Sequence, residues 1–221
     1  MTSSDAPPSD PPSEPLGLRT RKKQQRHQAI SETAIALFLE KGFDQVSVAE
    51  VAAAAEVSKP TLFRYFASKE DLVLHRFADH EDEPARVVAA RPAKRPALDA
   101  LHRHFLDGLE RRDPVTGLCD APAVLAFHRL LYGTPSLVAR LHGYQHRSEQ
   151  ALAEALTTAH GGRPLESRLA AAQIVAVQRV LAEENWRRIT GGESADEAWP
   201  DAVASANRAF AQLRSGLQRY A

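Results

Sequence analysis

The stretch Ser47–Leu72, SVAEVAAAAEVSKPTLFRYFASKEDL, decides the fold of this chain. Ser47 stands three positions before Glu50, which is the spacing of a capping box and predicts a short helix over residues 47–54. Ser58 begins a second short helix after a tight turn, and a proline in the first turn of that helix costs no hydrogen bond. Two short helices joined in this way have the proportions of a helix-turn-helix, whose second helix can enter the major groove of DNA.

A longer helix is predicted before this stretch, over residues 20–41. Its apolar residues recur at positions i, i+4, i+7 and i+8 and so form one face: Ile30, Ala34, Leu37 and Phe38. Gly42 follows and suits a left-handed helix cap. Because two short helices bury little apolar surface alone, this third helix is expected to complete a small core with them.

Basic residues gather at the start of that helix. Five lie within eight positions with no acid among them: Arg19, Arg21, Lys22, Lys23 and Arg26. Residues 19–69 hold nine Lys and Arg against five Asp and Glu, whereas the whole chain of 221 residues holds 28 of each kind. The balanced total excludes a uniformly basic coat for nucleic acid, and the local excess indicates an anionic partner. A solvated charged face is the alternative.

The second short helix is rich in hydroxyl, basic and aromatic groups that suit a DNA groove. Thr61 can contact a thymine methyl group or form hydrogen bonds, and Arg64 can donate to a guanine edge. Tyr65, Ser47 and Lys69 are candidates for phosphate contacts. The alternative is that the aromatic residues are half-buried, as in helix-turn-helix shapes that never meet DNA.

Residues 20–77 resemble the N-terminal domain of the TetR/AcrR family of transcriptional regulators. The family pattern A-x-F-x-x-x-G-F/Y matches residues 36–43, and [ST]-V-x-x-[IV]-A matches residues 47–52. A third pattern, V-S-x-x-x-[LF]-[FY]-x-[YH]-F-x-[SN]-K-[ED]-x-L, matches residues 57–72. Glu56 departs from the family, which often has glycine in that turn; a left-handed conformation there costs a side chain about 1 kcal/mol.

The resemblance implies a double-stranded DNA partner and assigns contact residues. The positions that supply most base and phosphate contacts in the family are, in this chain, Ser47, Lys59, Thr61, Phe63, Arg64, Tyr65 and Lys69. The preceding basic arm is placed to contact the DNA backbone or the minor groove through Arg19, Arg21 and Lys22.

The predicted fold class is all-α, because strand patterns are nearly absent. The resemblance implies that it consists of a three-helix helix-turn-helix head and a larger helical bundle that binds a ligand and dimerises. The predicted domains are a disordered Pro/Ser-rich tail (1–18), the DNA-binding domain (19–67) and the effector-binding and dimerisation domain (68–221). Later helices are predicted at roughly 97–112, 120–132, 136–160, 165–190 and 200–218. Ser194 and Glu197 form another capping pattern, and Pro200 predicts a break or kink there.

The predicted helix at 165–190 carries apolar residues on more than one face, which indicates both a core and a partner. In the last helix, residues at 3–4–3–4 spacing form a packing seam. The alternative is the core of a large monomer, whereas the resemblance implies a two-fold homodimer. Its predicted interface residues are Val177, Leu181, Phe210, Leu213 and Leu217. Two heads on such a body would read a palindromic operator, with recognition helices about 34–36 Å apart.

A small-molecule effector is expected to bind in the larger domain. It would favour a state in which the two DNA-binding heads are too far apart for the groove spacing, and the helix at 68–80 would transmit this change from the pocket to the head. Candidate pocket residues are His102, Phe105, Phe127, Arg129 and Gln178. The C-terminal half, particularly SLVARLHGYQHRSEQALAEAL, resembles regulators of the mycofactocin-system type, whose effectors are acyl-CoA thioesters. An acyl-CoA or another apolar anion is therefore the predicted ligand class.

Two other functions remain open. One is an architectural DNA-binding protein without an effector; the other is a metal-dependent sensor or enzyme that uses His142 and His146, which stand at i and i+4. No third metal ligand can be assigned, and the common catalytic motifs are absent, so neither enzyme activity, a metal nor a cofactor is expected. The chain has one cysteine, no secretory signal and no apolar run of about 20 residues, and it is expected in the cytoplasm away from membranes.

Overall fold

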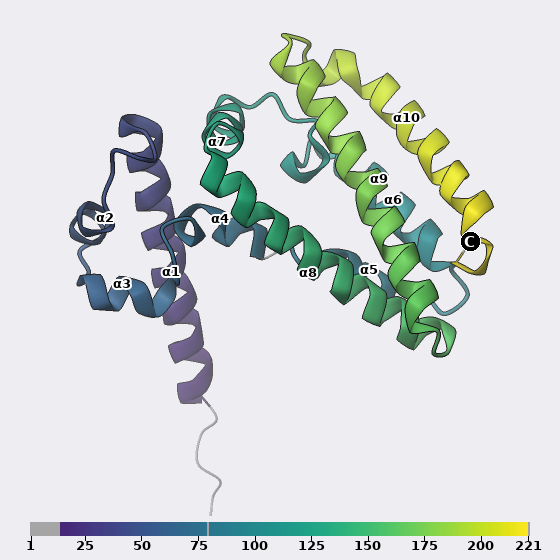
Figure 1. Cartoon of the computed structure of the whole chain (residues 1–221), viewed down its shortest axis with the longest axis horizontal. Coiled ribbons are helices and arrows are strands. Elements are labelled where there is room, and N and C mark those ends of the chain that lie inside the picture. The colour runs from purple at the N-terminus through teal and green to yellow at the C-terminus, as the bar shows by residue number, and fades with distance from the viewer. Residues whose placement is uncertain (1–13, 79, 221) are drawn as a thin grey trace, which may run out of the picture. The chain divides into compact units, whose positions relative to one another are not determined.

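Helices make up the regular secondary structure in the computed structural model, which describes residues 14–78 and 80–220 (Figure 1). No strand occurs among these residues, and the predicted all-α class is confirmed. The chain divides into two compact units, one ending at Leu72 and the other beginning at Val73. Within the described residues, no helix is both long and apolar enough to cross a membrane.

The first unit contains α1 (Glu14–Lys41), α2 (Val48–Ala54), α3 (Lys59–Tyr65) and the start of α4 (Asp71–Ala78). α1 begins at Glu14, six residues before the predicted start, so residues 14–18 are helical rather than part of a tail. Pro15 is compatible with this start because a proline in the first turn removes no intrahelical hydrogen bond. Residues 1–13, the rest of the predicted tail, lie outside the described residues.

A small apolar core joins the helices of the first unit. Its buried members are Ile30, Ala34, Ile35, Phe38, Phe43, Val46, Val51, Ala52, Leu62 and Phe66. Leu37, which the sequence pattern also assigned to this face, is only half-buried. The buried Ser31 hydroxyl on α1 donates to the Leu72 carbonyl at 2.7 Å, which satisfies both groups and fixes the start of α4 against α1.

Local hydrogen bonds begin α2 and α3 as the sequence predicts. Ser47 and Glu50 form the complete capping box of α2, and the Ser58 side chain accepts from the Thr61 amide to cap α3. Glu56, in the turn between them, has a φ of 53° and is therefore left-handed. The turn uses a conformation that favours glycine, so Glu56 stores strain of about 1 kcal/mol.

The second unit is an assembly of long helices. They are α5 (Glu83–Ala90), α6 (Ala97–Glu110), η1 (Pro114–Thr116), α7 (Pro122–Tyr132), α8 (Pro135–His160), α9 (Pro164–Thr190), α10 (Ala195–Gly216) and η2 (Gln218–Tyr220). In Figure 1, α9 runs between α8 and α10, and it packs against both. α6 packs against α10, and α5 packs against α8.

The helix at the end of the chain corrects one prediction. α10 begins at Ala195 behind a complete Ser194–Glu197 capping box and continues to Gly216 without a break at Pro200. Proline removes only one intrahelical hydrogen bond, and Pro200 is exposed near the helix start, where water can solvate the carbonyl that loses its donor. The well-capped first turn therefore carries the helix through the proline.

The core of the second unit corrects another prediction. Phe210 and Leu213 on α10 are 0% and 7% exposed, and both belong to the core that α6, α8, α9 and α10 share. Val177, Leu181 and Leu217 are half-buried and pack against the same core. The seam on α10 is therefore filled within one chain, and Phe210 and Leu213 are not available to a partner subunit.

Candidate DNA interface

Helix α3, the second helix of the helix-turn-helix, presents two different faces. Leu62 and Phe66 are 0% and 2% exposed and anchor the helix in the core of the first unit. Lys59, Phe63 and Arg64 are exposed, with 45% of the Phe63 residue open to solvent. A large aromatic ring between two cations on an exposed helix face is the composition that a DNA groove accommodates.

Thr61 and Tyr65 lie at the edges of that face and are half-buried. The Thr61 hydroxyl is 2.8 Å from the Ser58 hydroxyl, which also accepts from the Thr61 amide. With its hydroxyl held toward the helix cap, the methyl group of Thr61 is the part of the side chain best placed for an apolar contact. The sequence left open whether Thr61 makes a polar or an apolar contact, and this arrangement favours the apolar one.

Ser47 is the N-cap of α2 and a candidate for a phosphate contact. Its hydroxyl oxygen accepts from the Glu50 amide at 3.2 Å, and the Ser47 amide donates to Glu50 Oε2 at 2.7 Å. Hydrogen bonds to the Glu50 carboxylate from the Ser47 backbone, the larger cause, and from the Ser47 side chain lower the pKa of Glu50. Ser47 is exposed, so its hydroxyl is accessible to a phosphate oxygen.

The basic arm lies on α1, where Arg21, Lys22, Lys23 and Arg26 are all exposed. An open depression of about 680 Å³ runs between this arm and α3, and its walls are Lys22, Lys23, Gln25, Arg26 and Tyr65. The structure thus brings the arm and Tyr65, which are far apart in sequence, to one cationic surface. Arg19 lies among the residues whose side chains are outside the described part of the chain.

His27 is a structural member of this region that the sequence analysis missed. Its ring stacks on Phe66 with centroids 4.2 Å apart, and its Nε2 lies 3.3 Å from the Tyr65 carbonyl at the end of α3. It thereby ties the recognition helix to α1. His27 precedes Ile30 by three residues, so an extension of the apolar stripe by one turn would have identified it.

Lys69 does not lie on the exposed face of α3. Its ammonium donates to the Phe43 carbonyl and lies 4.3 Å from the centroid of the Phe43 ring and 5.5 Å from that of Phe38. The residue is half-buried. The sequence pattern alone did not show that this cation has partners within the chain.

The predicted effector residues fall into separate environments. His102 and Phe105 on α6 contact Phe210 on α10, with ring centroids 4.6 and 6.2 Å apart. Phe127 on α7 stacks on Phe77 of α4 at 6.3 Å. Of the remaining two candidates, Arg129 has an exposed side chain and Gln178 has a half-buried one.

His102 borders an open depression of about 390 Å³ on α6. Its walls are Arg95, Asp99, His102, Arg103, Leu106 and Asp107, which include only one of the five predicted effector residues. Burial lowers the pKa of His102, against the opposing effect of its 3.0 Å hydrogen bond with Asn207. The imidazole is therefore held in its neutral form near pH 7.

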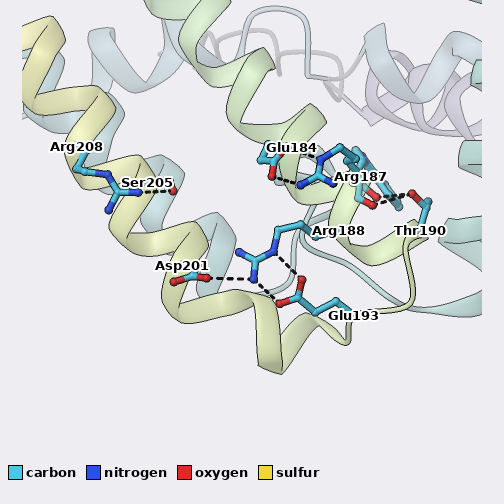
Figure 2. Close-up of polar contacts among 9 residues, drawn as sticks. Glu184, Arg187, Arg188, Thr190, Glu193, Asp201, Ser205 and Arg208 are labelled. Carbon is cyan, nitrogen blue, oxygen red and sulfur yellow. Dashed lines mark hydrogen bonds and ion pairs between the residues drawn. The ribbon is translucent and has the colours of Figure 1, made fainter.

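An ion-pair network links α9 to α10. Arg188 bridges Glu193 and Asp201 with an Nε–Oε2 distance of 2.6 Å and an Nη2–Oδ2 distance of 3.2 Å, as Figure 2 shows. This ion-pair network joins the end of α9 to the first turns of α10.

Elsewhere α9 presents an apolar stripe in which Leu165, Leu169 and Val180 are 66%, 56% and 54% exposed.

The two histidines of the metal alternative have other neighbours. His142 Nδ1 lies 3.1 Å from Gln145 Oε1, and His146 Nε2 lies 3.0 Å from Gln150 Nε2. His128 packs its ring on Trp186 at 4.0 Å. Across the described residues, no group of three or more His, Cys, Asp or Glu residues could hold a metal ion. Residues 14–78 and 80–220 thus supply no third ligand for this alternative.

A helix-turn-helix head with an exposed cationic recognition helix, followed by a helical bundle, defines a DNA-binding transcriptional regulator. Residues 30–75 match the family model described as bacterial regulatory proteins, tetR family. TcmR of Streptomyces glaucescens, an HTH-type transcriptional regulator, is 31% identical over 176 residues, which cover 78% of each chain. The chain therefore belongs to the TetR family, whose members are transcriptional regulators and not enzymes.

Two further similarities are shorter or more distant. MftR of Mycobacterium tuberculosis, whose name refers to mycofactocin biosynthesis, is 42% identical over 60 residues, or 27% of this chain and 30% of that protein. Native NalD, the secondary repressor of the MexAB-OprM multidrug efflux pump in Pseudomonas aeruginosa, has a TM-score of 0.55 and 17% identity. That match covers 85% of this chain and 97% of the NalD chain, and it shows the shared fold.

Proposed function

We propose that this TetR-family protein is a repressor that binds a palindromic operator as a homodimer and leaves it when a small molecule binds. The proposed DNA contacts are supported by the exposed face of α3 and by the cationic depression beside it on α1. The description of NalD as a repressor supports the same direction of regulation.

The proposed base readout uses three side chains of α3. Arg64 donates to a guanine edge, while the Thr61 methyl group and the Phe63 ring contact thymine methyl groups. The phosphate contacts come from Lys59, Ser47 and Tyr65, together with the basic arm of α1. In the arm these are Arg19, Arg21 and Lys22.

The proposed dimer uses the outer face of α9 rather than the seam of α10. Residues at helical spacing form this stripe, and they are Leu165, Leu169, Ala172, Ala176 and Val180. Three of them are more than half exposed, which is unusual for large apolar residues in a continuous row. A two-fold axis would bury the stripe against its own copy and present two α3 helices to one face of the operator.

The effector is proposed to bind the second unit and to prefer the state that cannot span two adjacent major grooves. A ligand can shift this equilibrium only by its differential affinity for the two states, which in such systems commonly changes DNA affinity about 5- to 150-fold. An acyl-CoA or another apolar anion is the proposed class, and Arg129, Gln178 and Phe127 remain candidates for its site. α4 runs across the division between the units and is the proposed link.

Binding to selected DNA tests the main proposal. Duplexes enriched by the protein from a random pool should share an inverted repeat, and Arg64→Ala should weaken binding to them about 5- to 100-fold. Arg103→Ala, which removes an exposed arginine on α6, is the matched control and should leave affinity unchanged. Enrichment without a repeat, or equal affinity of the Arg64 variant, would contradict the proposal. Absence of release by any acyl-CoA or apolar anion would favour the architectural alternative.

A further inference from the structure

We propose that His27 is a proton-linked residue of the DNA interface, whose imidazole gains a proton when DNA phosphates reach Tyr65, so that DNA affinity rises as the pH falls from about 8 to about 6. The inference rests on the DNA interface proposed above and adds a titrating residue to it. His27 is the only histidine in the sequence of the first unit, Met1–Leu72, and the other eight follow it in the second unit. Among the side chains of the first unit, His27 is therefore the one expected to change charge near neutral pH.

The imidazole of His27 is held between α1 and the end of α3. Its ring stacks on Phe66 with centroids 4.2 Å apart and an interplanar angle of 19°, and its Nε2 lies 3.3 Å from the Tyr65 carbonyl oxygen. Because a carbonyl can only accept, Nε2 carries the proton of this hydrogen bond in either charge state. The second proton is taken by Nδ1, so the ring can become charged and still donate to Tyr65.

Two cations of the basic arm oppose a positive charge on His27 in the free protein. Lys23 lies one turn before His27 on α1, Arg26 is its neighbour in sequence, and both are exposed. Partial burial of the imidazole opposes the charge as well, whereas the face of the Phe66 ring favours it. These opposing effects leave room for His27 to gain a proton when its surroundings change.

The other charged groups beside this part of α1 come from α3, from the start of α4 and from the segment between them. Arg64 is the cation in the last turn of α3, the segment carries Lys69 and Glu70, and α4 begins with Asp71, which is 8% exposed. These groups are present with and without DNA. They help to set the starting charge of His27, but a change in that charge on binding must come from the DNA.

DNA phosphates bring negative charge close to this imidazole. Tyr65 is a proposed phosphate contact, and it lines the cationic depression together with Lys23 and Arg26. The centroids of the Tyr65 and His27 rings are 6.0 Å apart, so a phosphate at this tyrosine lies at a distance on the order of the Debye length, about 8 Å at physiological salt. The phosphates also neutralise the two cations that oppose charge on His27. Both effects favour the imidazolium form, and DNA binding and proton uptake therefore strengthen each other.

The sign of the pH dependence follows from this coupling. Because the complex holds the proton more tightly than the free protein does, DNA affinity is highest where His27 is protonated and falls as the pH rises through its titration. On the duplex selected by the wild type, at constant salt, affinity should be about tenfold higher at about pH 6 than at about pH 8.

Substitutions of His27 separate proton linkage from a purely structural role. His27→Gln cannot titrate but can donate to the Tyr65 carbonyl, and its affinity should be nearly equal at the two pH values. A purely structural role would lower affinity by the same factor at both pH values and leave the dependence in place. His27→Arg carries a permanent charge that can stack on Phe66, so it should keep tight binding at about pH 8. His142→Gln, which changes an exposed histidine of α8, is the matched control and should keep the wild-type pH dependence.

The NMR signal of the imidazole gives a second measurement. The resonance of His27 is identified by its loss in His27→Gln, and its titration midpoint should move to higher pH when the selected duplex is bound.

Three outcomes would each overturn the proposal: a pH dependence that survives in His27→Gln, a wild-type affinity that is equal at the two pH values, or a midpoint that DNA does not move. If Arg64→Ala binds the selected duplex like the wild type, the proposed DNA interface itself has failed, which is a separate result.

Discussion

Glu56 shows how a single residue departs from the conformation that its side chain prefers. It is left-handed, with a φ of 53°, in the turn between α2 and α3. Glu56→Gly should raise the free energy of unfolding by up to about 1 kcal/mol, because glycine removes the steric cost of the left-handed conformation. Part of this gain is lost, because glycine also increases the conformational entropy of the unfolded chain. Urea denaturation measures the effect. Glu56→Gln keeps the strain and should be neutral, and a glycine variant less stable than that control would contradict this account.

Glu83 predicts a dependence of stability on pH. The His104 and His80 side chains, with His–Glu distances of 3.2 and 2.7 Å, hold the pKa of Glu83 well below its usual value of 4.5. Since the folded pKa is depressed, the unfolded chain takes up the proton first. The stabilisation is present above about pH 4.5 and is lost as the pH falls below it.

The Glu83→Gln variant tests this dependence. It should lose about 1–3 kcal/mol of stability at neutral pH, the range for a hydrogen bond to a charged group. The difference from the wild type should shrink as the pH falls below 4.5. Thermal unfolding at several pH values measures this, with the exposed Glu110→Gln as the control. A difference that stays constant down to strongly acidic pH would show that the carboxylate charge plays no part.

At the scale of elements, α10 distinguishes a core seam from a dimer seam. Phe210 is fully buried against Phe105 and His102 on α6. Phe210→Ala should therefore cost about 3–5 kcal/mol of unfolding free energy, as truncation of a buried aromatic ring does. Val180→Ala on the outer face of α9 is the contrasting variant and should cost little in the fold of one subunit. Denaturant unfolding at two protein concentrations separates the loss of core packing from the loss of subunit association. A small loss of unfolding free energy in Phe210→Ala would instead assign this residue to the dimer interface.

Helix boundaries show which local rules prevail. The capping box at Ser47 begins α2 as predicted, and the capping box at Ser194 begins α10 at Ala195, five residues before the predicted start at residue 200. At Pro200 the predicted break does not occur, because one lost hydrogen bond on an exposed face does not outweigh a capped first turn and the buried residues that follow.

At the scale of the whole molecule, the proposed palindromic operator requires two DNA-binding heads, and the apolar stripe of α9 is where we expect the subunits to meet. Leu169→Glu places a charge at a position that is 56% exposed in one chain, so the fold should be retained while the dimer dissociates. A monomer binds one half-site only, and its affinity for the palindrome should fall at least tenfold.

Sedimentation and DNA titration together measure the Leu169 effect. The exposed charge-neutral change Gln173→Ala on the same helix is the control and should leave both mass and affinity unchanged. A Leu169→Glu protein that remains dimeric would place the interface on another surface.

The exposure of residues at the candidate DNA interface was predictable in part. The exposed face of α3 was identified correctly from residue types, since Leu62 and Phe66 fit the apolar period and Lys59 and Arg64 do not. The contacts of Lys69 were not, because its partner is the carbonyl of Phe43, and a main-chain acceptor 26 residues away leaves no mark in a sequence pattern.

The amino-acid sequence by itself determined most of the helices, the caps at Ser47 and Ser58 and the helix-turn-helix, because hydrogen bonds and apolar spacing within one or two turns specify these features. Only the tertiary structure decided which apolar stripes are filled within one chain. Phe210 and Leu169 are equally apolar members of regular helical patterns, yet one is buried and the other is 56% exposed. Burial depends on what packs against a face, and that partner comes from a distant part of the chain or from another subunit.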